Sequence, residues 1–356
     1  MRFIGNKENL VENIHRIMIS RNIKGDSFFD VFSGTTSVAK YFKKLDYKVI
    51  SSDLLYFSYV LQRAYIVNNS EPTFKKLLSV LKFNSHQLVA TPLSTVIEYL
   101  NQIPPIEGFI YQNYTPKGTS KLKIPRKYFN DENGQIIDSI RQQIEQWKNK
   151  NLIDKNEYFI LISCLIETVP FYANITGVYA AFQKQWDPRA VKKIKLRQIT
   201  LIYNNKINKS FNTDSINLVN KVKADIFYLD PPYNQRQYAP NYHLLETIAK
   251  YDNPTIKGVT GLREYSKQKS KFCNANTALQ ELSRFAKTAR CKYLMLSYNS
   301  EGIMPQKEIV LTLEKHGTVE LVKFDYLRYK SNNNGDSKHK KHIKEQLYIL
   351  TKSNNN

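Results

Sequence analysis

The stretch Asp225-Ile-Phe-Tyr-Leu-Asp-Pro-Pro-Tyr233 joins a short apolar run to an abrupt turn. The run Ile226 to Leu229 is rich in β-branched and aromatic residues, which predicts a buried central strand. Because prolines can neither continue strand pairing nor begin a helix inside the turn, the chain must turn after Asp230. Ligands bind at the carboxyl ends of strands in open α/β sheets. The stretch therefore predicts either a binding turn, whose acid and carbonyls accept hydrogen bonds from an amine while Tyr233 stacks on a flat base, or an ordinary strand exit.

The composition favours a folded protein that binds a polyanion. The 356 residues suffice for one large domain or two of ordinary size, and 42% of them are hydrophobic. Lys and Arg number 53 against 31 Asp and Glu, a formal net charge of +22. This excess favours nucleic acid over a membrane as the partner, although basic surfaces also serve solubility.

The cysteines and apolar runs bear on the cellular compartment. Cys164, Cys273 and Cys291 are far apart and odd in number, so they predict neither a disulfide framework nor a zinc site. The first ten residues lack the apolar core of a signal peptide, and no apolar run reaches the roughly 18 residues of a membrane span. We therefore expect a cytoplasmic protein without metal or membrane segment.

Two strand ends near the amino terminus predict a nucleoside site. A strand over 28–32 enters the turn Ser33-Gly34-Thr35, whose backbone N–H groups begin a helix and favour a polar or negative ligand. The turn is neither a phosphate-binding Gly-Lys-Ser/Thr loop nor a full Gly-x-Gly-x-x-Gly motif. A second strand, over 48–53, ends in Asp53, which is placed to accept from a ribose diol, to cap the next helix, or to do both.

Residues 70–205 interrupt this α/β pattern with mostly helical periodicity. Cations and aromatic residues alternate there, which suits phosphate contact and base readout, although each single cation is as well explained by a solvated face. We interpret the stretch as an insertion that forms the wall for a large substrate. The helices expected in or before it are 7–19, 74–81, 94–100, 136–147, 155–169 and one that carries the cations from Arg189 to Arg197.

The α/β pattern returns after residue 206. We expect a short strand ending near 211–215 with a helix to about Val222, and the loop 329–344 between the last two strands is basic and suits a phosphate clamp. His243 is expected to be structural or to face DNA, and not to be a catalytic base. The remaining expected elements are helices over 277–288 and 307–316 and strands over 293–299, 319–328 and 346–351.

In order along the chain, these pieces resemble the DNA adenine-N6 methyltransferases that use S-adenosylmethionine, with the Dam-like order of motifs, and among them the FokI-type adenine methylases. The matching pieces are Arg2-Phe-Ile-Gly-Asn-Lys7, Asp30-Val-Phe-Ser-Gly-Thr35, Asp53, Asp214, Asp230-Pro-Pro-Tyr233, Gln237-Tyr238 with Asn241-Tyr242-His243, and Leu296-Ser-Tyr-Asn299. The resemblance implies a Rossmann-like α/β methyltransferase fold with a mixed seven-stranded sheet. It also implies a catalytic domain over 1–69 and 206–356 and a largely helical target-recognition insertion over 70–205.

The resemblance assigns roles to individual residues. The catalytic set that it implies is Asp230, Pro231, Pro232 and Tyr233, with Asp230 and the Pro231 carbonyl accepting from the N6 amine. The cofactor set is Phe3, Lys7, Asp30, Phe32, Ser33, Gly34, Asp53 and Asp214. The cations and aromatic residues of the insertion and of the polar and basic loops, and not the resemblance, predict the DNA contacts Lys117, Lys121, Lys123, Arg126, Lys184, Arg189, Arg236, Tyr238 and Lys330. The family's glycine loop often has more than one glycine, whereas Gly34 is followed here by two threonines.

The implied reaction needs no metal and no strong base, because the amine proton can leave after methyl transfer. The target adenine must be flipped out of the duplex. We expect a monomer and, because the chain shows no evident nuclease motif, a separately encoded restriction endonuclease as its partner. An RNA adenine or DNA cytosine-N4 methyltransferase and a catalytically silent DNA-binding protein of the same fold are the alternatives. Asp230 disfavours the cytosine-N4 branch, in which Ser is more frequent at that position.

Overall fold

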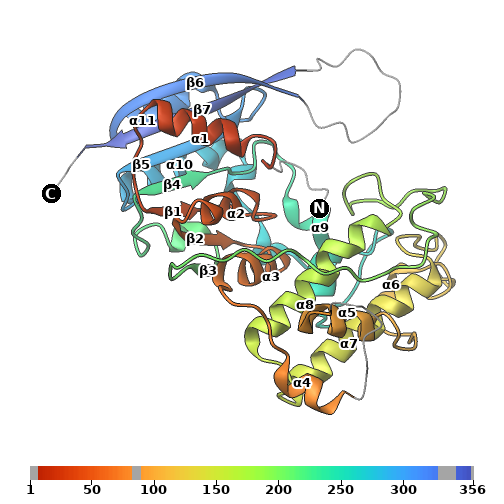
Figure 1. Cartoon of the computed structure of the whole chain (residues 1–356). Coiled ribbons are helices and arrows are strands. Elements are labelled where there is room, and N and C mark those ends of the chain that lie inside the picture. Colours follow the sequence, from red (N-terminus) through yellow and green to blue (C-terminus); the bar gives the residue numbers. More distant parts are fainter. Residues whose placement is uncertain (1–6, 82–89, 328–341, 354–356) are drawn as a thin grey trace. The chain divides into compact units, whose positions relative to one another are not determined.

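The computed structural model describes residues 7–81, 90–327 and 342–353, and these divide into two compact units (Figure 1). The sheet unit takes in the described parts of Ile4–Val67, Ile202–Tyr238 and Ser266–Asn356. The helical unit takes in those of Asn68–Leu201 and Ala239–Tyr265. The segment 239–265, which the sequence placed in the catalytic domain, therefore makes its contacts within the helical unit.

Seven strands form one mixed sheet in the order β3-β2-β1-β4-β5-β7-β6. The pairs within β3-β2-β1-β4-β5 are parallel, and β7 pairs antiparallel with both β5 and β6. This arrangement confirms the predicted α/β methyltransferase fold. The strands are β1 (Ser27–Asp30), β2 (Lys48–Asp53), β3 (Lys209–Asn212), β4 (Ile226–Leu229), β5 (Tyr293–Asn299), β6 (Gly317–Leu327) and β7 (His342–Lys352).

The order of the parallel strands reverses between β1 and β4, so this pair is the topological switch point of the sheet. In sheets of this kind the connections leave the carboxyl ends of the two central strands in opposite directions, which opens a crevice there. All four residues of β4 are buried, as expected for a central strand covered on both faces. The turn that follows β4 therefore lies where the fold itself favours a ligand.

Helices cover both faces of the sheet because successive strand residues alternate between the faces (Figure 1). Phe28 of β1 stacks on Phe42 of α2 with ring centroids 3.8 Å apart, whereas Phe29 packs in the opposite core with α10 and α11. The helical elements of the sheet unit are α1 (Val11–Ser20), α2 (Ser37–Lys44), α3 (Tyr56–Gln62), the π-helix η1 (Arg63–Val67), η3 (Ser215–Asn217), η4 (Ser266–Gln268), η5 (Lys271–Cys273), α10 (Ala275–Thr288) and α11 (Gln306–Glu314).

The helical unit packs around α8, a helix that is buried on nearly all sides. Asp154 begins it with a reciprocal capping box to Glu157, which satisfies donors at the helix start. The helices of this unit are α4 (Lys75–Val80), α5 (Pro92–Leu100), α6 (Phe109–Tyr114), α7 (Asp131–Asn149), α8 (Lys155–Thr168), η2 (Val169–Phe171) and α9 (Tyr238–Lys250, its first residue in the sheet unit).

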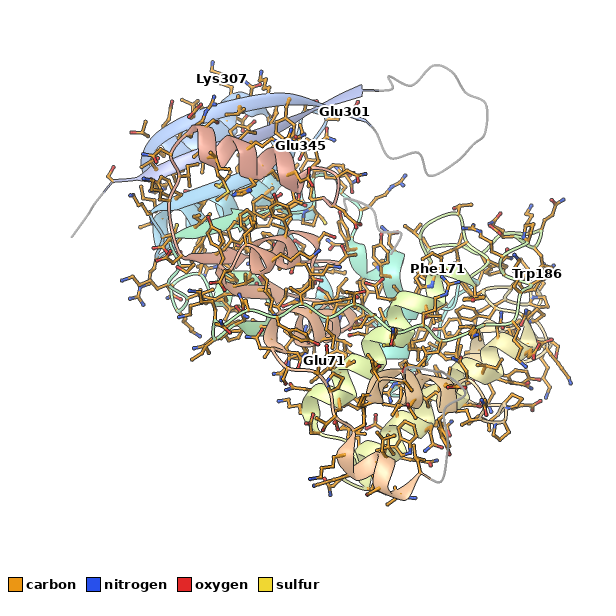
Figure 2. The ribbon with its side chains drawn as sticks, in the orientation of Figure 1. Glu71, Phe171, Trp186, Glu301, Lys307 and Glu345 are labelled. Atoms are coloured by element: carbon orange, nitrogen blue, oxygen red, sulfur yellow. The ribbon has the colours of Figure 1, made fainter. Side chains whose placement is uncertain are left out.

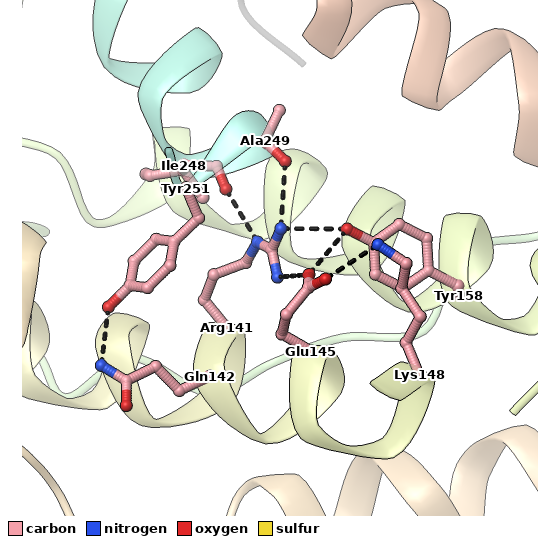
Figure 3. A network of polar contacts seen from close by, with 8 residues as sticks. All are labelled: Arg141, Gln142, Glu145, Lys148, Tyr158, Ile248, Ala249 and Tyr251. Carbon is pink, nitrogen blue, oxygen red and sulfur yellow. Dashed lines mark hydrogen bonds and ion pairs between the residues drawn. The ribbon is translucent and has the colours of Figure 1, made fainter. Parts of the chain in front are cut away.

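A buried guanidinium joins segments far apart in the sequence within the helical unit (Figure 3). Arg141 of α7 donates from Nε to the Ile248 carbonyl (3.0 Å) and from Nη2 to the Ala249 carbonyl (3.3 Å), which satisfies carbonyls in the last turn of α9. It also donates to Glu145 at 2.7 Å and to the Tyr158 hydroxyl at 3.0 Å. These bonds attach α9 to the inserted helices, which explains why 239–265 groups with them.

Some predicted elements differ from the structure. The cations from Arg189 to Arg197 were expected on a helix, but the segment follows turns and irregular backbone. Asn133 and Asn101 hold that backbone, accepting from the N–H groups of Ile194 (2.8 Å) and Leu196 (2.7 Å), so side-chain pairing replaces a helical ladder. The helix predicted up to Val222 is only the short η3. Among the described residues, no helix combines the length and apolarity needed to cross a membrane.

Candidate active site

Three acids stand at the carboxyl ends of neighbouring parallel strands in the sheet unit. Asp30 ends β1, Asp53 ends β2 and Asp230 directly follows β4. Since parallel strands end at the same edge of a sheet, the fold brings the acids together although they are spread over 200 residues of sequence. This edge is the candidate active site.

Asp30 is almost fully buried beneath the turn that follows β1. Its Oδ2 accepts from Ser33 Oγ (2.9 Å) and from the N–H of Ala39 (3.2 Å) in the first turn of α2. Burial raises the pKa of Asp30 to about 7, against the lowering effect of the Ser33 hydrogen bond, and the charge of Asp230 raises it further. The hydrogen bonds of Asp30 therefore fix the shape of the turn. Its raised pKa means that the carboxyl group ionises less readily than an exposed aspartate.

The turn Ser33-Gly34-Thr35 is held by the next strand. Gly34 has a φ of +49°, in the left-handed region that glycine adopts without strain, and its N–H donates to Asp53 Oδ2 at 2.8 Å. Asp53 Oδ1 accepts from the N–H of Leu55 at 2.8 Å, just before α3. The predicted capping of the next helix is not observed, because Leu55 is the N-cap of α3 and that cap has no side-chain hydrogen bond. Asp53 instead holds the turn after β1, a role that was not predicted, and its contact with a ribose stays a prediction.

Two more of the residues predicted at the cofactor site, Asp214 and Phe32, lie near this edge. Asp214 follows β3 and accepts from the N–H of Ile216 at 3.2 Å, which caps η3. Phe32 is partly buried and packs edge-on against Phe272, with ring centroids 5.4 Å apart. Phe3, also predicted here, lies outside the described residues.

Asp230 shares a cation with a second, unpredicted acid. Lys7 Nζ lies 3.4 Å from Asp230 Oδ1 and 2.5 Å from Glu345 Oε1. Glu345 stands in β7, beside β5 (Figure 2), and also accepts from Ser297 Oγ of β5 at 2.6 Å. Lys7 is thus held against β7 while its charge also faces the Asp-Pro-Pro-Tyr turn.

The sequence did hold a signal for Glu345. It directly precedes the predicted strand 346–351 and lies within β7, where residues 346–350 are all buried, and such a position is rarely acidic without a partner. What the sequence lacked was the identity of the partner, since Lys7 is 338 positions away. Glu345 is the main site residue that sequence reasoning missed.

The pKa values of Asp230 and Lys7 are both shifted upward from their usual values. The pKa of Asp230 is raised to about 7, mainly by burial; the Lys7 charge opposes this rise and the Glu345 charge adds to it. Burial lowers the pKa of Lys7, but the two carboxylates outweigh burial and hold it above the usual lysine value. One fixed cation is therefore shared between two acids, and Asp230 is the one with the weaker hold on it.

The pKa of Asp230 predicts an acid limb in the activity profile. Asp230 is predicted to accept hydrogen bonds from an amine and must be ionised to do so. We therefore expect kcat/KM for the expected methyl transfer to reach half its plateau near pH 7 and to be roughly a tenth of the plateau at pH 6. Since Glu345 raises the pKa of Asp230, Glu345→Gln should move the limb to lower pH. Initial rates between pH 5.5 and 9 check this, and an identical limb in both proteins contradicts the assignment to Asp230.

The raised pKa of Asp230 also makes the stability of the fold depend on pH. A carboxyl whose pKa rises from 3.8 unfolded to about 7 folded binds more protons in the folded state between these values. The free energy of unfolding therefore contains a contribution from Asp230 that falls as the pH rises from about 4 to about 7. The ionisation of Asp230 thus opposes folding at neutral pH, a pattern common among groups at functional sites.

The rest of the catalytic turn is anchored by the loop after β5. Pro231 is buried, and Tyr233 is half-buried against the core beneath it. The Tyr233 carbonyl accepts from the N–H of Ile303 at 2.9 Å, while Tyr298 Oη lies 3.5 Å away. The Asp-Pro-Pro-Tyr turn is therefore held at its carboxyl side as well as at Asp230.

The residues predicted to contact DNA fall into different environments. Arg189 is paired with Asp187, and Arg126 is buried, with its guanidinium donating to backbone carbonyls. Its donors are thus occupied by the protein, which departs from a phosphate-contact role. Tyr238 begins α9 half-exposed, and Lys330 lies outside the described residues. The exposed members are Lys117, Lys121, Lys123, Lys184 and Arg236.

The seven-stranded order, with acids after β1, β2 and β4, defines an α/β fold of the methyltransferase class. The model of the D12 class N6 adenine-specific DNA methyltransferase family matches residues 3–311. The chain belongs to this family, which confirms the resemblance drawn from its motifs.

Individual relatives agree with the family. The chain is 42% identical to the type II methyltransferase M.FokI of Planomicrobium okeanokoites over 97% of this chain and 51% of that protein. It is 39% identical to the modification methylase StsI of Streptococcus sanguinis over 99% of this chain and 52% of that protein. The type II methyltransferase M.NlaIII of Neisseria lactamica is 37% identical over 99% of this chain and its own full length. The chain thus spans about half the length of the first two relatives.

Proposed function

We propose that this chain transfers a methyl group from S-adenosylmethionine to N6 of an adenine in duplex DNA, as the modification enzyme of a restriction system. The observation that carries the proposal is the Asp230 carboxyl, followed by Pro-Pro-Tyr at the switch point of the sheet and facing the buried Lys7. Family membership and the names of the relatives, type II methyltransferase and modification methylase, support it. A separately encoded restriction endonuclease is the partner that this setting implies.

The three carboxyl groups at the sheet edge suit a cofactor that carries positive charge. Burial raises the pKa of both Asp30 and Asp230 to about 7, and Asp53 stands beside them at the end of β2. A ligand carrying a sulfonium and an ammonium group would favour the ionised form of these acids. When bound, S-adenosylmethionine supplies an electrophilic methyl group. Asp53 would accept from its ribose hydroxyls, Asp214 from its adenine amine, and the turn after β1 would enclose it.

On the target side, the chain's residues act on the adenine amine. Its lone pair is delocalised into the ring, which makes the nitrogen a weak nucleophile. Asp230 and the Pro231 carbonyl would accept hydrogen bonds from the amine protons, which favours a pyramidal nitrogen with its lone pair directed at the methyl group. Tyr233 would stack on the flipped base. Most of the acceleration would come from positioning and from polar groups fixed in advance of the charge shift.

The helical unit is proposed as the target-recognition part. Its exposed lysines at 117, 121, 123 and 184 suit contact with phosphates, which position a protein on a duplex without specifying sequence. The unit also includes 239–265, so recognition need not be confined to the predicted insertion.

The proposal is tested by sequencing for methylated adenine in DNA from cells that express the chain and otherwise lack adenine methylation. We expect N6-methyladenine at one short recurring sequence. A second arm supplies purified protein with labelled S-adenosylmethionine and either duplex DNA or RNA. Label in RNA with none in DNA would contradict the DNA proposal, and calorimetry without cofactor binding would favour a silent DNA-binding protein.

A further inference from the structure

The loop Lys257–Leu262 of the helical unit is a tight hairpin. The N–H of Lys257 donates to the Leu262 carbonyl and the N–H of Leu262 to the Lys257 carbonyl, both at 2.8 Å. Gly258 and Gly261 have φ values of +71° and +73°, which favour glycine. A Cβ at Gly261 would also lie only 2.9 Å from the Tyr114 ring. Both glycines are thus needed for the loop's present shape.

Buried side chains hold the loop's carbonyls in succession. Arg126 donates from Nη2 to the Gly258 carbonyl (2.9 Å) and from Nε to the Val259 carbonyl (3.1 Å). The hydroxyl of Tyr128 lies 2.9 Å from the Thr260 carbonyl, and that of Tyr114 donates to the Gly261 carbonyl at 2.9 Å. Each of the four carbonyls from 258 to 261 therefore has a buried side-chain donor group within hydrogen-bond distance.

The Tyr128 hydroxyl has one proton and two carbonyls in range, since Tyr179 O lies 2.7 Å away. The Tyr179 carbonyl has a second donor, because His243 Nε2 is 2.9 Å from it. Burial lowers the pKa of His243 to about 4, so its ring is neutral and carries one N–H. If that proton is on Nε2, it satisfies Tyr179 and leaves the Tyr128 proton for the loop.

This support does not serve to bury the loop. Val259 is 56% exposed and Lys257 is also exposed, although the buried Arg126 guanidinium donates hydrogen bonds to the backbone of this loop. Desolvating a charged group is costly even when carbonyls accept from it. Fixing an exposed side chain in advance lowers the ordering cost of binding, which is the general reason for such support.

We propose that the loop Lys257–Leu262 contacts base edges of the target duplex, with Val259 as an apolar contact to a base. The proposal rests on the proposed function and adds a recognition element outside residues 70–205. A compact branched side chain matches the methyl group that thymine presents in the major groove. The two glycines permit close approach of the backbone, and Lys257 at the loop's base suits a neighbouring phosphate.

The test compares Val259→Ala with Val80→Ala in the full chain. Val80 is a matched control because it is also 56% exposed and lies in the same unit, in α4. Fluorescence anisotropy measures the Kd for a duplex carrying the sequence that the methyladenine sequencing experiment finds, and for a scrambled duplex. We expect Val259→Ala to weaken binding to the specific duplex about tenfold and to the scrambled duplex less than about twofold. Val80→Ala should change neither.

Two results would overturn the loop proposal while the proposed function stands. One is equal binding by the Val259 and Val80 variants to both duplexes. The other is a loss of the same size on both duplexes, which would mean contact with the DNA backbone and not with bases. If the wild-type chain methylates no duplex DNA, the proposed function fails and the loop proposal fails with it. Melting curves of both variants should match the wild type, since both substitutions are at exposed positions.

Discussion

Asp230→Ala is expected to lower kcat for methyl transfer to duplex DNA by roughly 10³-fold, the loss typical when one preorganised polar group is removed from a reacting centre. The carboxylate is proposed to accept from the N6 amine, and alanine leaves no acceptor at this position. Asp230→Asn keeps one acceptor oxygen but loses the charge, so we expect a smaller loss of roughly 10²-fold. Single-turnover rates with labelled cofactor measure both.

A measurement of cofactor binding distinguishes the loss of the Asp230 hydrogen-bond acceptor from a structural collapse of the site. Asp30 and Asp53 stay in place in Asp230→Ala, so calorimetry should give a Kd for S-adenosylmethionine within about fivefold of the wild type. Glu320→Ala is the control, because this exposed acid of β6 pairs only at the surface with Arg21. Unchanged methyl transfer by Asp230→Ala would remove Asp230 from the mechanism.

The second large effect is expected on stability. Glu345→Ala removes the closer of the two carboxylates around Lys7 and leaves the buried ammonium with Asp230 at 3.4 Å. Breaking one side of a buried ion pair typically costs about 3–5 kcal/mol, and we expect about 3 kcal/mol because Asp230 remains. Ser297 also loses the acceptor for its hydroxyl. The free energy of unfolding from guanidinium titrations at pH 7.5 measures this.

Glu345→Gln should recover most of this loss, because the amide oxygen can still accept from Lys7 and Ser297. The matched control is again Glu320→Ala, for which a change of at most about 0.5 kcal/mol is expected, as is usual for exposed pairs. If Glu345→Ala were as mild as Glu320→Ala, the buried network would have no part in holding Lys7 at the site.

Much of the sheet unit could be predicted from local patterns. The strands expected over 48–53 and 293–299 have those bounds in the structure, since short runs of buried, strand-favouring residues bounded by polar ones depend on their own neighbours. The turn after the first strand, Asp53 and the Asp230 turn were each predicted at the carboxyl end of a strand, and parallel strands place these ends at one edge of the sheet. A rule of topology thus linked residues that no local pattern could link.

Prediction was weaker where a side chain's partner lies far along the chain. The cations from Arg189 to Arg197 had a plausible helical spacing, but asparagines from two other segments hold their backbone in a different form. Arg126 was predicted to contact DNA because a cation in a basic run is usually exposed. Its carbonyl acceptors at Gly258 and Val259 are over 130 residues away in the sequence, so no local pattern indicated that it is buried. Spacing describes one segment and cannot show which other segment will cover it.

The sequence by itself determined the α/β class, the order of the motifs and the Asp-Pro-Pro-Tyr turn, because each depends on short-range periodicity or on proline geometry. Only the tertiary structure decided that Lys7 is held by Glu345, that 239–265 joins the helical unit, and that Arg126 supports a loop. Each depends on a pairing between buried polar groups. Because an unpaired polar group is costly once it is removed from water, the partner is set by which groups the folded chain brings close together.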